Sequence, residues 1–548
     1  MKRISFLIIL AFIASCAKIV PPTGGPKDVT PPKVIKTIPR NLSKDISPNE
    51  IEIKFDEYIV LKEINKNLIV SPPLNHKPTV KVYNKKIILK LNDTLKANTT
   101  YIINFGNSIA DFTEGNVLSN YKYVFSTGKF LDSLKVSGYV TDAYTNAPEQ
   151  DIYVMLYDTT CDSCLFNEIP QYITKTDKSG FFELTNIKTG TYKLFCLKDK
   201  NNNMKYDLPD EKIGFYEKYV IPYVKTTNDT LQKYLYGPDS IKLYSFDEKY
   251  KLDAFIEKAK RLNAATLQIV FSKPPDNKPK ITFFNFDSIS TIIKEFSEKN
   301  DTINIWMTDT TYWKKDTIAA VINYTTNKVK KTDTLFFKWF RKKINTQPVK
   351  LSLKYNPLPP FKLLIVESNE PFTTIDTAKI KLYKAKDTTH IPLNYNINAE
   401  KRYLEINFDK KEEEVYKIVF DSCAVKGVFQ NCNDSTNFTF KIQKQDYYGT
   451  LIIKINNKPN HNIVLVLTDE KHKKIYRKQI LNNKDTAIFK NLSPKTYSLQ
   501  IIFDRNNDKE WTSGNLIEHI QPEKVKYINN IKIKSLWENK IEINLKDD

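Results

Sequence analysis

Short runs in which apolar and polar residues alternate recur along most of the chain and constrain its fold more than any other feature. Examples are residues 51–55 (Ile-Glu-Ile-Lys-Phe), 79–83 (Thr-Val-Lys-Val-Tyr) and 121–125 (Tyr-Lys-Tyr-Val-Phe). Successive side chains of a strand point to opposite faces, so each run buries one face. Proline, asparagine and glycine mark turns between the runs. The sequence therefore predicts an all-β chain of tandem β-sandwiches in an elongated array.

Length and composition support several packed cores. The 548 residues exceed what one core usually organises, and 41% of them are hydrophobic. Tyrosine and phenylalanine number 31 each, which favours strands. The net charge of +21 is spread along the chain, with only short runs such as residues 341–343. We therefore expect no nucleic-acid partner, because such a partner requires a concentrated basic surface.

The N-terminus has the three parts of an export signal. Lys2 and Arg3 are basic, residues 4–13 are almost wholly apolar, and Ile13-Ala14-Ser15 precede Cys16. The apolar run is too short to span a bilayer. An ordinary secretory peptide is the alternative. The pattern resembles the bacterial lipobox, which implies a signal peptide at 1–15, lipid on Cys16 with acyl chains such as palmitate, and membrane anchoring.

By the same resemblance, Ala17 in place of an aspartate favours the outer membrane, while the periplasmic or surface face stays open. Residues 16–32 are rich in proline and glycine and predict a tether. The patterns at 55–59, 95–101, 111–116 and 125–128 follow it. They resemble the SbsA-like bacterial Ig-like domain found in envelope lipoproteins of the Bacteroidota. This resemblance implies an Ig-like sandwich over 33–128.

A second pattern begins with Val136-x-Gly138-x-Val140 and continues through Gly180 and Tyr192. It resembles the transthyretin-like (carboxypeptidase regulatory-like) sandwich, a non-catalytic module, and implies a domain over 132–225. Residues 186–194 align without gaps on residues 491–499, which predicts a second such domain over 446–548. Two weaker Ig-like copies are predicted at 240–345 and 346–443. Helical spacing over 252–259 suggests one short helix at a joint.

Two loops carry oxygen-bearing side chains at the spacing of a calcium loop. The ligand candidates are Asp199, Asn201, Asn203, Asp207 and Asp210 in the first loop, and Asp504, Asn506 and Asp508 in the second. The alternative is a turn in which the side chains cap their own backbone. The second loop has fewer charged ligands, so we expect weaker binding there. No other cofactor is expected.

Cysteines in an oxidising compartment favour disulfides. Cys161 and Cys164 form one close pair, and Cys423 and Cys432 form another. A four-cysteine zinc site is the alternative, and Cys196 lies in an apolar run that predicts core.

Catalytic motifs are sparse. No zinc-protease motif or nucleophile elbow is present, and the acidic residues at 56–57 and 412–414 are the only suggestion of a glycoside hydrolase. Trp306, Tyr312 and Trp313 suggest a glycan-binding surface as another alternative. The sequence predicts instead a non-catalytic, lipid-anchored scaffold that contacts outer-membrane or envelope proteins as an accessory subunit.

Overall fold

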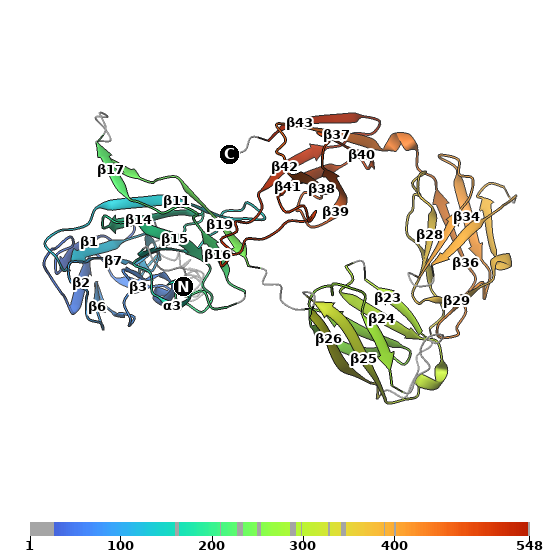
Figure 1. Ribbon diagram of the computed structural model, residues 1–548, viewed down its shortest axis with the longest axis horizontal. Helices are drawn as coiled ribbons and strands as arrows, with labels where there is room; N and C mark the ends of the chain where they lie inside the picture. The colour runs from blue at the N-terminus through green and yellow to red at the C-terminus, as the bar shows by residue number, and fades with distance from the viewer. Residues whose placement is uncertain are drawn as a thin grey trace, which may run out of the picture. The chain divides into compact units, whose positions relative to one another are not determined.

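The structure, a computed structural model, describes residues 27–158, 164–208, 210–226, 234–248, 254–284, 292–297, 299–326, 329–340, 347–387, 389–398 and 402–545. Strands dominate these residues, with a few short helical turns between them (Figure 1). The predicted all-β class is thereby confirmed. None of the helices in the described ranges is long and apolar enough to cross a membrane.

The chain divides into two compact units. The first contains Met1–Glu248 and Thr512–Lys524, and the second contains Lys249–Trp511 and Val525–Asp548. Each unit holds sandwiches whose facing sheets bury a core of their own.

The first sandwich has sheets in the orders β1-β2-β6-β5, β10-β7-β4 and β3-β8-β9. Alternation works as expected in β2, where Ile51, Ile53 and Phe55 are buried and the residues between them are not. The elements are β1 (Val34–Ile38), β2 (Glu50–Phe55), β3 (Ile59–Leu61), α2 (Ile64–Asn67), β4 (Ile69–Ser71), β5 (Thr79–Tyr83), β6 (Lys86–Lys90), β7 (Thr100–Asn104), β8 (Ile109–Asp111), β9 (Val117–Leu118) and β10 (Lys122–Ser126).

The second sandwich forms a sheet in the order β13-β12-β15-β16-β19-β11-β14, and β17 and β18 form a separate two-stranded ribbon. The elements are β11 (Leu134–Asp142), β12 (Tyr153–Asp158), α3 (Cys164–Asn167), β13 (Tyr172–Lys175), β14 (Phe181–Ile187), β15 (Tyr192–Leu197), β16 (Lys212–Phe215), β17 (Tyr223–Thr226), β18 (Tyr234–Gly237) and β19 (Ile241–Asp247).

The predicted boundary of the second sandwich at residue 225 is wrong. Strand β19 was assigned to the next domain, at 240–345, but it pairs in parallel with β11 and antiparallel with β16. Ile241 and Leu243 belong to the core cluster of the second sandwich. Burial of these two side chains therefore keeps β19 there, although the ribbon separates it from β16 in the sequence.

The last sandwich repeats the strand pairing of the second. Its first strand pairs antiparallel with β40 and parallel with the final strand β43, just as β11 pairs with β14 and β19. Its sheets have the orders β40-β37-β43 and β39-β38-β41-β42. The elements are η4 (Gln445–Tyr447), β37 (Gly449–Asn456), β38 (Asn462–Thr468), β39 (Ile475–Leu481), β40 (Thr486–Leu492), β41 (Thr496–Asp504), β42 (Val525–Lys532) and β43 (Glu538–Asn544).

The third sandwich pairs the sheets β20-β21-β24-β23 and β22-β25-β26. The helix predicted over 252–259 is wrong for the residues described there, because β20 starts at Ile256 and pairs with β21. Pairing with a partner strand outweighs the helical spacing of a few apolar residues. The elements are β20 (Ile256–Asn263), β21 (Thr266–Phe271), β22 (Lys280–Phe283), β23 (Ile292–Phe296), β24 (Thr302–Met307), η1 (Thr310–Tyr312), β25 (Thr317–Thr326) and β26 (Val329–Lys338).

The fourth sandwich has sheets in the orders β27-β28-β33-β32, β31-β30-β34-β36 and β29-β35. Its core includes Val366, Leu382 and Phe420. The elements are β27 (Leu351–Leu353), β28 (Leu364–Ser368), β29 (Phe372–Ile375), η2 (Thr377–Lys379), β30 (Ile380–Lys384), β31 (His390–Ile391), β32 (Asn394–Asn398), β33 (Tyr403–Asn407), β34 (Val415–Phe420), β35 (Val425–Gly427) and β36 (Thr436–Lys441).

Candidate functional site

The ribbon of β17 and β18 projects from the second sandwich (Figure 1). Its strands pair antiparallel with Tyr223 opposite Gly237 and Lys225 opposite Leu235. Residues opposite one another in an antiparallel pair share a face. One face of the ribbon therefore presents Tyr223, Lys225 and Leu235 together.

Large apolar side chains are exposed along this ribbon and the segment that leads into it. They are between 36% and 59% exposed and comprise Tyr219, Ile221, Tyr223, Val224, Tyr234 and Leu235. We call these six residues the ribbon patch. Tyr223 and Leu235 lie on one face of the ribbon, and Val224 and Tyr234 lie on the other. Several large apolar side chains exposed on one short element are typical of a binding surface, whereas single exposed apolar residues are ordinary.

Local contacts fix the ring of Tyr223 in the ribbon patch. Gly237 leaves room for it, since a Cβ built on this glycine would meet the Tyr223 ring at 2.5 Å. The Nζ atom of Lys225 lies 5.0 Å from the centre of the same ring. A tyrosine held in this way contributes contact area to a partner at a small entropic cost, because little side-chain freedom is left to lose.

Sequence reasoning missed the ribbon patch because most of it lies near or between the predicted domains 132–225 and 240–345. The available signal was the density of tyrosines at positions 219, 223, 234 and 236, at the end of one predicted domain and in the gap before the next.

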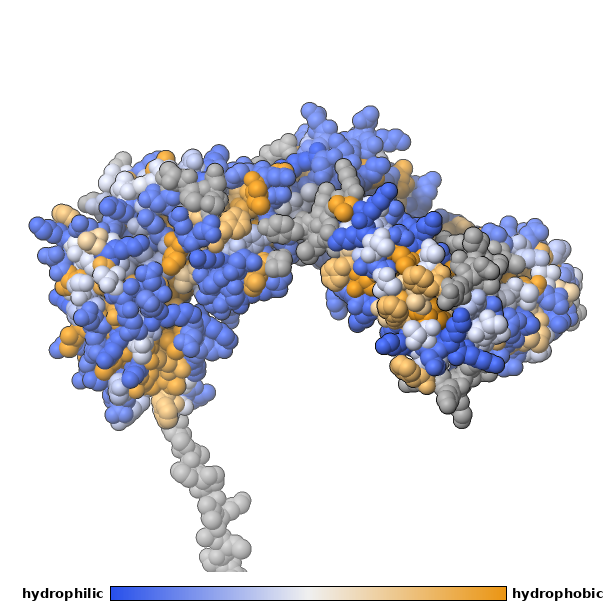
Figure 2. Space-filling model, turned by 60° about the horizontal axis from the view of Figure 1, so that its bottom comes forward, coloured by the Kyte–Doolittle hydropathy of each residue, from blue (hydrophilic) through white to orange (hydrophobic). Residues whose placement is uncertain are grey.

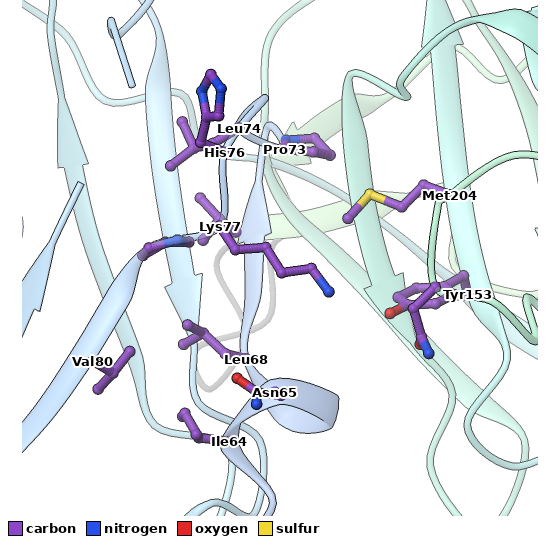
Figure 3. Close-up of a pocket in the computed structure, with 13 residues that line it drawn as sticks. Ile64, Asn65, Leu68, Pro73, Leu74, His76, Lys77, Val80, Tyr153 and Met204 are labelled. Atoms are coloured by element: carbon purple, nitrogen blue, oxygen red, sulfur yellow. The ribbon is translucent and has the colours of Figure 1, made fainter. Parts of the chain in front are cut away.

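A cavity of about 100 Å³ lies where the first sandwich meets the second, within the first unit (Figure 3). Its lining is mostly apolar, and Figure 3 shows Lys77 extending from the first sandwich toward the side that carries Tyr153 and Met204. His76 and Lys77 are its titratable residues apart from Tyr153, and no carboxylate lines it. The cavity therefore lacks the paired carboxylates that glycoside hydrolysis requires.

The acidic residues considered for hydrolysis have other contacts. Asp56 accepts a hydrogen bond from the Lys33 amide at 2.8 Å, and Glu413 forms an ion pair with Lys444 at 3.1 Å. Burial of Glu57 and the neighbouring Asp111 raise the pKa of its carboxyl group. Neither acidic segment lines the cavity.

The proposed glycan-binding aromatics are not a surface platform. Trp306 is 8% exposed and Trp313 is 6% exposed. Phe429 of the fourth sandwich packs against both rings, with centroids 6.3 Å and 5.4 Å away. The burial of both tryptophans removes the main basis of the glycan-binding alternative, because these two residues form a joint between the third and fourth sandwiches within the second unit.

The loop after β15 brings its predicted ligands together in part. Asn201 Nδ2 and Asn203 Nδ2 donate to the two carboxylate oxygens of Asp207, at 3.0 and 2.6 Å. Asp199 accepts from the backbone amides of Asn202 and Met204, at 2.6 and 2.7 Å. These contacts are those of self-capping turns.

Asp210 does not join the other predicted ligands of this loop, because its carboxylate forms an ion pair with Lys200. The neighbouring Glu211 is fully buried instead and accepts hydrogen bonds from the amides of Lys200, Asp207 and Leu208. Sequence reasoning missed Glu211, since the calcium spacing directed attention to the residue before it.

In the second loop, Asp504 accepts a hydrogen bond from the Lys509 amide at 3.1 Å, and Asn506 Nδ2 donates to Asp508 Oδ2 at 3.0 Å. Within the described residues, no group of three or more His, Cys, Asp or Glu side chains is placed to hold a metal. Any metal held by either loop would therefore also need amide or backbone oxygens.

The structure describes four of the six cysteines, namely Cys164, Cys196, Cys423 and Cys432. A disulfide joins Cys423 to Cys432, whose Cα atoms are 4.6 Å apart. Cys164 is buried, while Cys161 and Cys16 lie outside the described residues, so their predicted roles stay predictions. Cys196 is buried in the core as predicted, and burial raises the pKa of its thiol.

The molecular surface is mainly hydrophilic on the face seen in Figure 2, with apolar residues in separate patches.

Comparison with known proteins identifies one segment. Residues 28–127 match the model of the bacterial Ig-like domain, in agreement with the Ig-like resemblance of residues 33–128. No match was found among curated proteins.

Solved structures with similar arrangements include BcpA, the major pilin subunit of Bacillus cereus, at 9% identity, covering 75% of this chain and 98% of that chain with a TM-score of 0.16. The N-terminal part of the bacterial S-layer protein SbsC matches at 18% identity, covering 38% and 44%, with a TM-score of 0.14. Titin domains I67–I69 match at 10% identity, covering 54% and 99%, with a TM-score of 0.12. At such TM-scores these likenesses do not bear on function.

Proposed function

We propose that the protein is a non-catalytic scaffold, anchored in the outer membrane by lipid on Cys16, that binds another envelope protein through the ribbon patch. The observation that carries the proposal is the exposure of six large apolar side chains on and beside one projecting ribbon. Tyrosine is enriched at protein interfaces because it combines apolar area with a polar tip.

The ribbon also offers backbone groups to a partner. Among the described residues β17 and β18 are strand partners only of each other, and β18 also lies against β11, so the edge of β17 is the one offered to an added strand. A partner that presents an apolar extended segment would gain main-chain hydrogen bonds along the edge and side-chain contacts on the face. Such a partner would be an accessory or core subunit of an envelope complex.

Affinity purification tests the interaction. The full chain is extracted from native membranes in mild detergent, and co-purifying proteins are quantified by mass spectrometry. With the natural chain we expect an envelope protein to co-purify in stoichiometric amount. With the double variant Tyr223→Ser, Leu235→Ser, the amount of this co-purifying protein should fall at least tenfold. The matched control is Phe336→Ser, Val329→Ser, which removes an exposed aromatic and an exposed aliphatic side chain from β26.

The proposal fails if the natural chain is isolated alone, or if the ribbon variant retains the partner as well as the control does. Binding of the ribbon to lipid vesicles instead, lost in the same variant, would replace the protein partner with a membrane surface. The anchor is tested separately, because Cys16→Ala should abolish palmitate labelling and release the chain from the membrane fraction.

A further inference from the structure

The carboxylate of Asp504, the last residue of β41, is buried with one oxygen unpartnered. The residue is 0% exposed, and its Oδ1 atom has no hydrogen-bond partner among the described residues. An ionised oxygen removed from water is costly unless a donor or a cation compensates its charge. Asp504 Oδ1 is therefore a position at which the protein favours a positive charge.

The carboxylate faces the loop that follows it. Its other oxygen, Oδ2, accepts the Lys509 amide from within that loop at 3.1 Å. Two further oxygen-bearing side chains occur at alternate positions, and they meet each other, since Asn506 Nδ2 donates to Asp508 Oδ2 at 3.0 Å. A carboxylate, an amide and a second carboxylate thus occupy positions 1, 3 and 5 of one tight turn.

The corresponding loop after β15 differs at its first residue. Both oxygens of Asp199 accept backbone amides, at 2.6 and 2.7 Å, so its charge is already compensated. The sequence favoured this loop for calcium because it carries more acidic residues. The structure favours the second loop instead. Of the two loops, it is the one that combines the ligand spacing of a calcium loop with a buried carboxylate oxygen that has no hydrogen-bond partner among the described residues.

We propose that Asp504, Asn506 and Asp508, together with the backbone carbonyl of Glu510, bind a single Ca²⁺ ion. Side-chain oxygens at positions 1, 3 and 5 and a carbonyl at position 7 form the early ligand set of calcium loops, and water completes the coordination. With two carboxylates, the affinity falls in the range of extracellular calcium modules, about 10⁻⁴ to 10⁻³ M. Mg²⁺ binds less well, because it demands a smaller, stricter octahedron.

Calcium titration of the full chain tests this site. The chelator-treated protein is titrated with CaCl₂ while thermal unfolding and binding heat are measured. Trp511, packed beside the loop against the cluster that includes Val466 and Ile502, provides a local fluorescence signal. We expect saturable binding of one ion, a rise in melting temperature and a change in tryptophan emission.

The variant Asp504→Asn keeps the shape of the side chain but removes its charge, and it should weaken binding at least tenfold. Asp199→Asn is the matched control in the other loop and should leave the affinity within twofold. If Asp504→Asn does not fold, Asp508→Asn serves in its place with the same expected loss.

Three results would overturn the proposal. One is the absence of binding at several millimolar Ca²⁺, which would mean that a water molecule, and not a cation, contacts Asp504 Oδ1. Another is an affinity in the folded loop variant equal to that of the natural chain. The third is an equal response to Mg²⁺, which would contradict the calcium class of ligand.

Discussion

Lys212 Nζ lies 2.5 Å from Asp142 Oδ2, so that a lysine at the start of β16 is paired with the last residue of β11. Glu149 Oε1 approaches the same ammonium group at 2.7 Å. Burial opposes the charged form of Asp142, yet hydrogen bonds from Lys212 and Thr145 outweigh it and lower the pKa of this carboxyl group. Burial likewise opposes the charged lysine, but the hydrogen bonds to Asp142 and Glu149 raise the pKa of Lys212.

We expect Lys212→Met to destabilise the first unit by about 2–4 kcal/mol, because Asp142 would lose its cation in a largely buried setting and Glu149 would keep only Lys198, at 3.2 Å. Chemical denaturation measures this free energy of unfolding. Lys200→Met is the control, because the pair between Lys200 and Asp210 is exposed and such pairs contribute about 0–1 kcal/mol. Equal effects of the two substitutions would contradict the prediction.

The same cluster predicts a pH dependence. The pKa of Asp142 is lower in the folded state, so its contribution is present above the unfolded value near pH 4 and is lost as the pH falls through the folded pKa. The pKa of Lys212 is raised, so its contribution persists below about pH 10.4 and is lost as the pH rises through the folded pKa. In Lys212→Met the folded pKa of Asp142 should rise toward its unfolded value, so the stability that Asp142 loses on acidification should become smaller. An unchanged acid limb in unfolding measured from pH 2 to 7 would contradict this.

Phe429→Ala should loosen the joint between the third and fourth sandwiches. The ring contacts Trp306 and Trp313, and Glu295 strengthens the joint by accepting from Trp306 Nε1 at 3.1 Å and Arg402 Nε at 2.9 Å. Since Phe429 is half-buried, we expect the free energy of unfolding of the second unit to fall by about 1–3 kcal/mol and the tryptophan emission to shift to the red. The exposed Phe336→Ala is the control, and an identical response would exclude a structural joint at Phe429.

Gly138→Ala should disrupt the pairing of β11 with β19. A Cβ at this position would lie 2.1 Å from the backbone oxygen of Ile241, so one strand must move. We expect a destabilisation of about 1–3 kcal/mol, typical of overpacking. Lys242→Ala, an exposed substitution on β19, should change stability by less than about 0.5 kcal/mol. Hydrogen exchange of the β19 amides measures the effect, and unchanged protection would refute it.

Periodicity was sufficient to predict the strands of the sandwiches, because burial of alternate residues is a local property of the sequence. The repeat between 186–194 and 491–499 also identified equivalent elements, namely β15 with β41, which occupy the same place in their sheets. The position of β19 was not predictable in this way. Its alternation fits either neighbouring domain, and its long-range pairing with β11 and β16 assigns it to the second sandwich.

Site residues depended still more on contacts between distant segments. Trp306 and Trp313 suggested a glycan-binding surface in the sequence, but Phe429, more than a hundred positions away, packs against both rings. The two candidate calcium loops have nearly the same spacing of oxygen-bearing residues. Whether the first aspartate accepts backbone amides, as Asp199 does, or keeps an unpartnered oxygen, as Asp504 does, depends on where the backbone of the loop lies, which the sequence does not reveal. The ribbon patch required knowledge of which tyrosines remain exposed.

In the second and last sandwiches, the first strand lies parallel to the final one, as β11 beside β19 and β37 beside β43. Mechanical tension applied between the two ends of such a sandwich pulls these strands past each other lengthwise. Because the hydrogen bonds lie across the strands, the whole ladder bears the load at once and does not open bond by bond. This strand order suits a domain that must bear tension along the chain without unravelling.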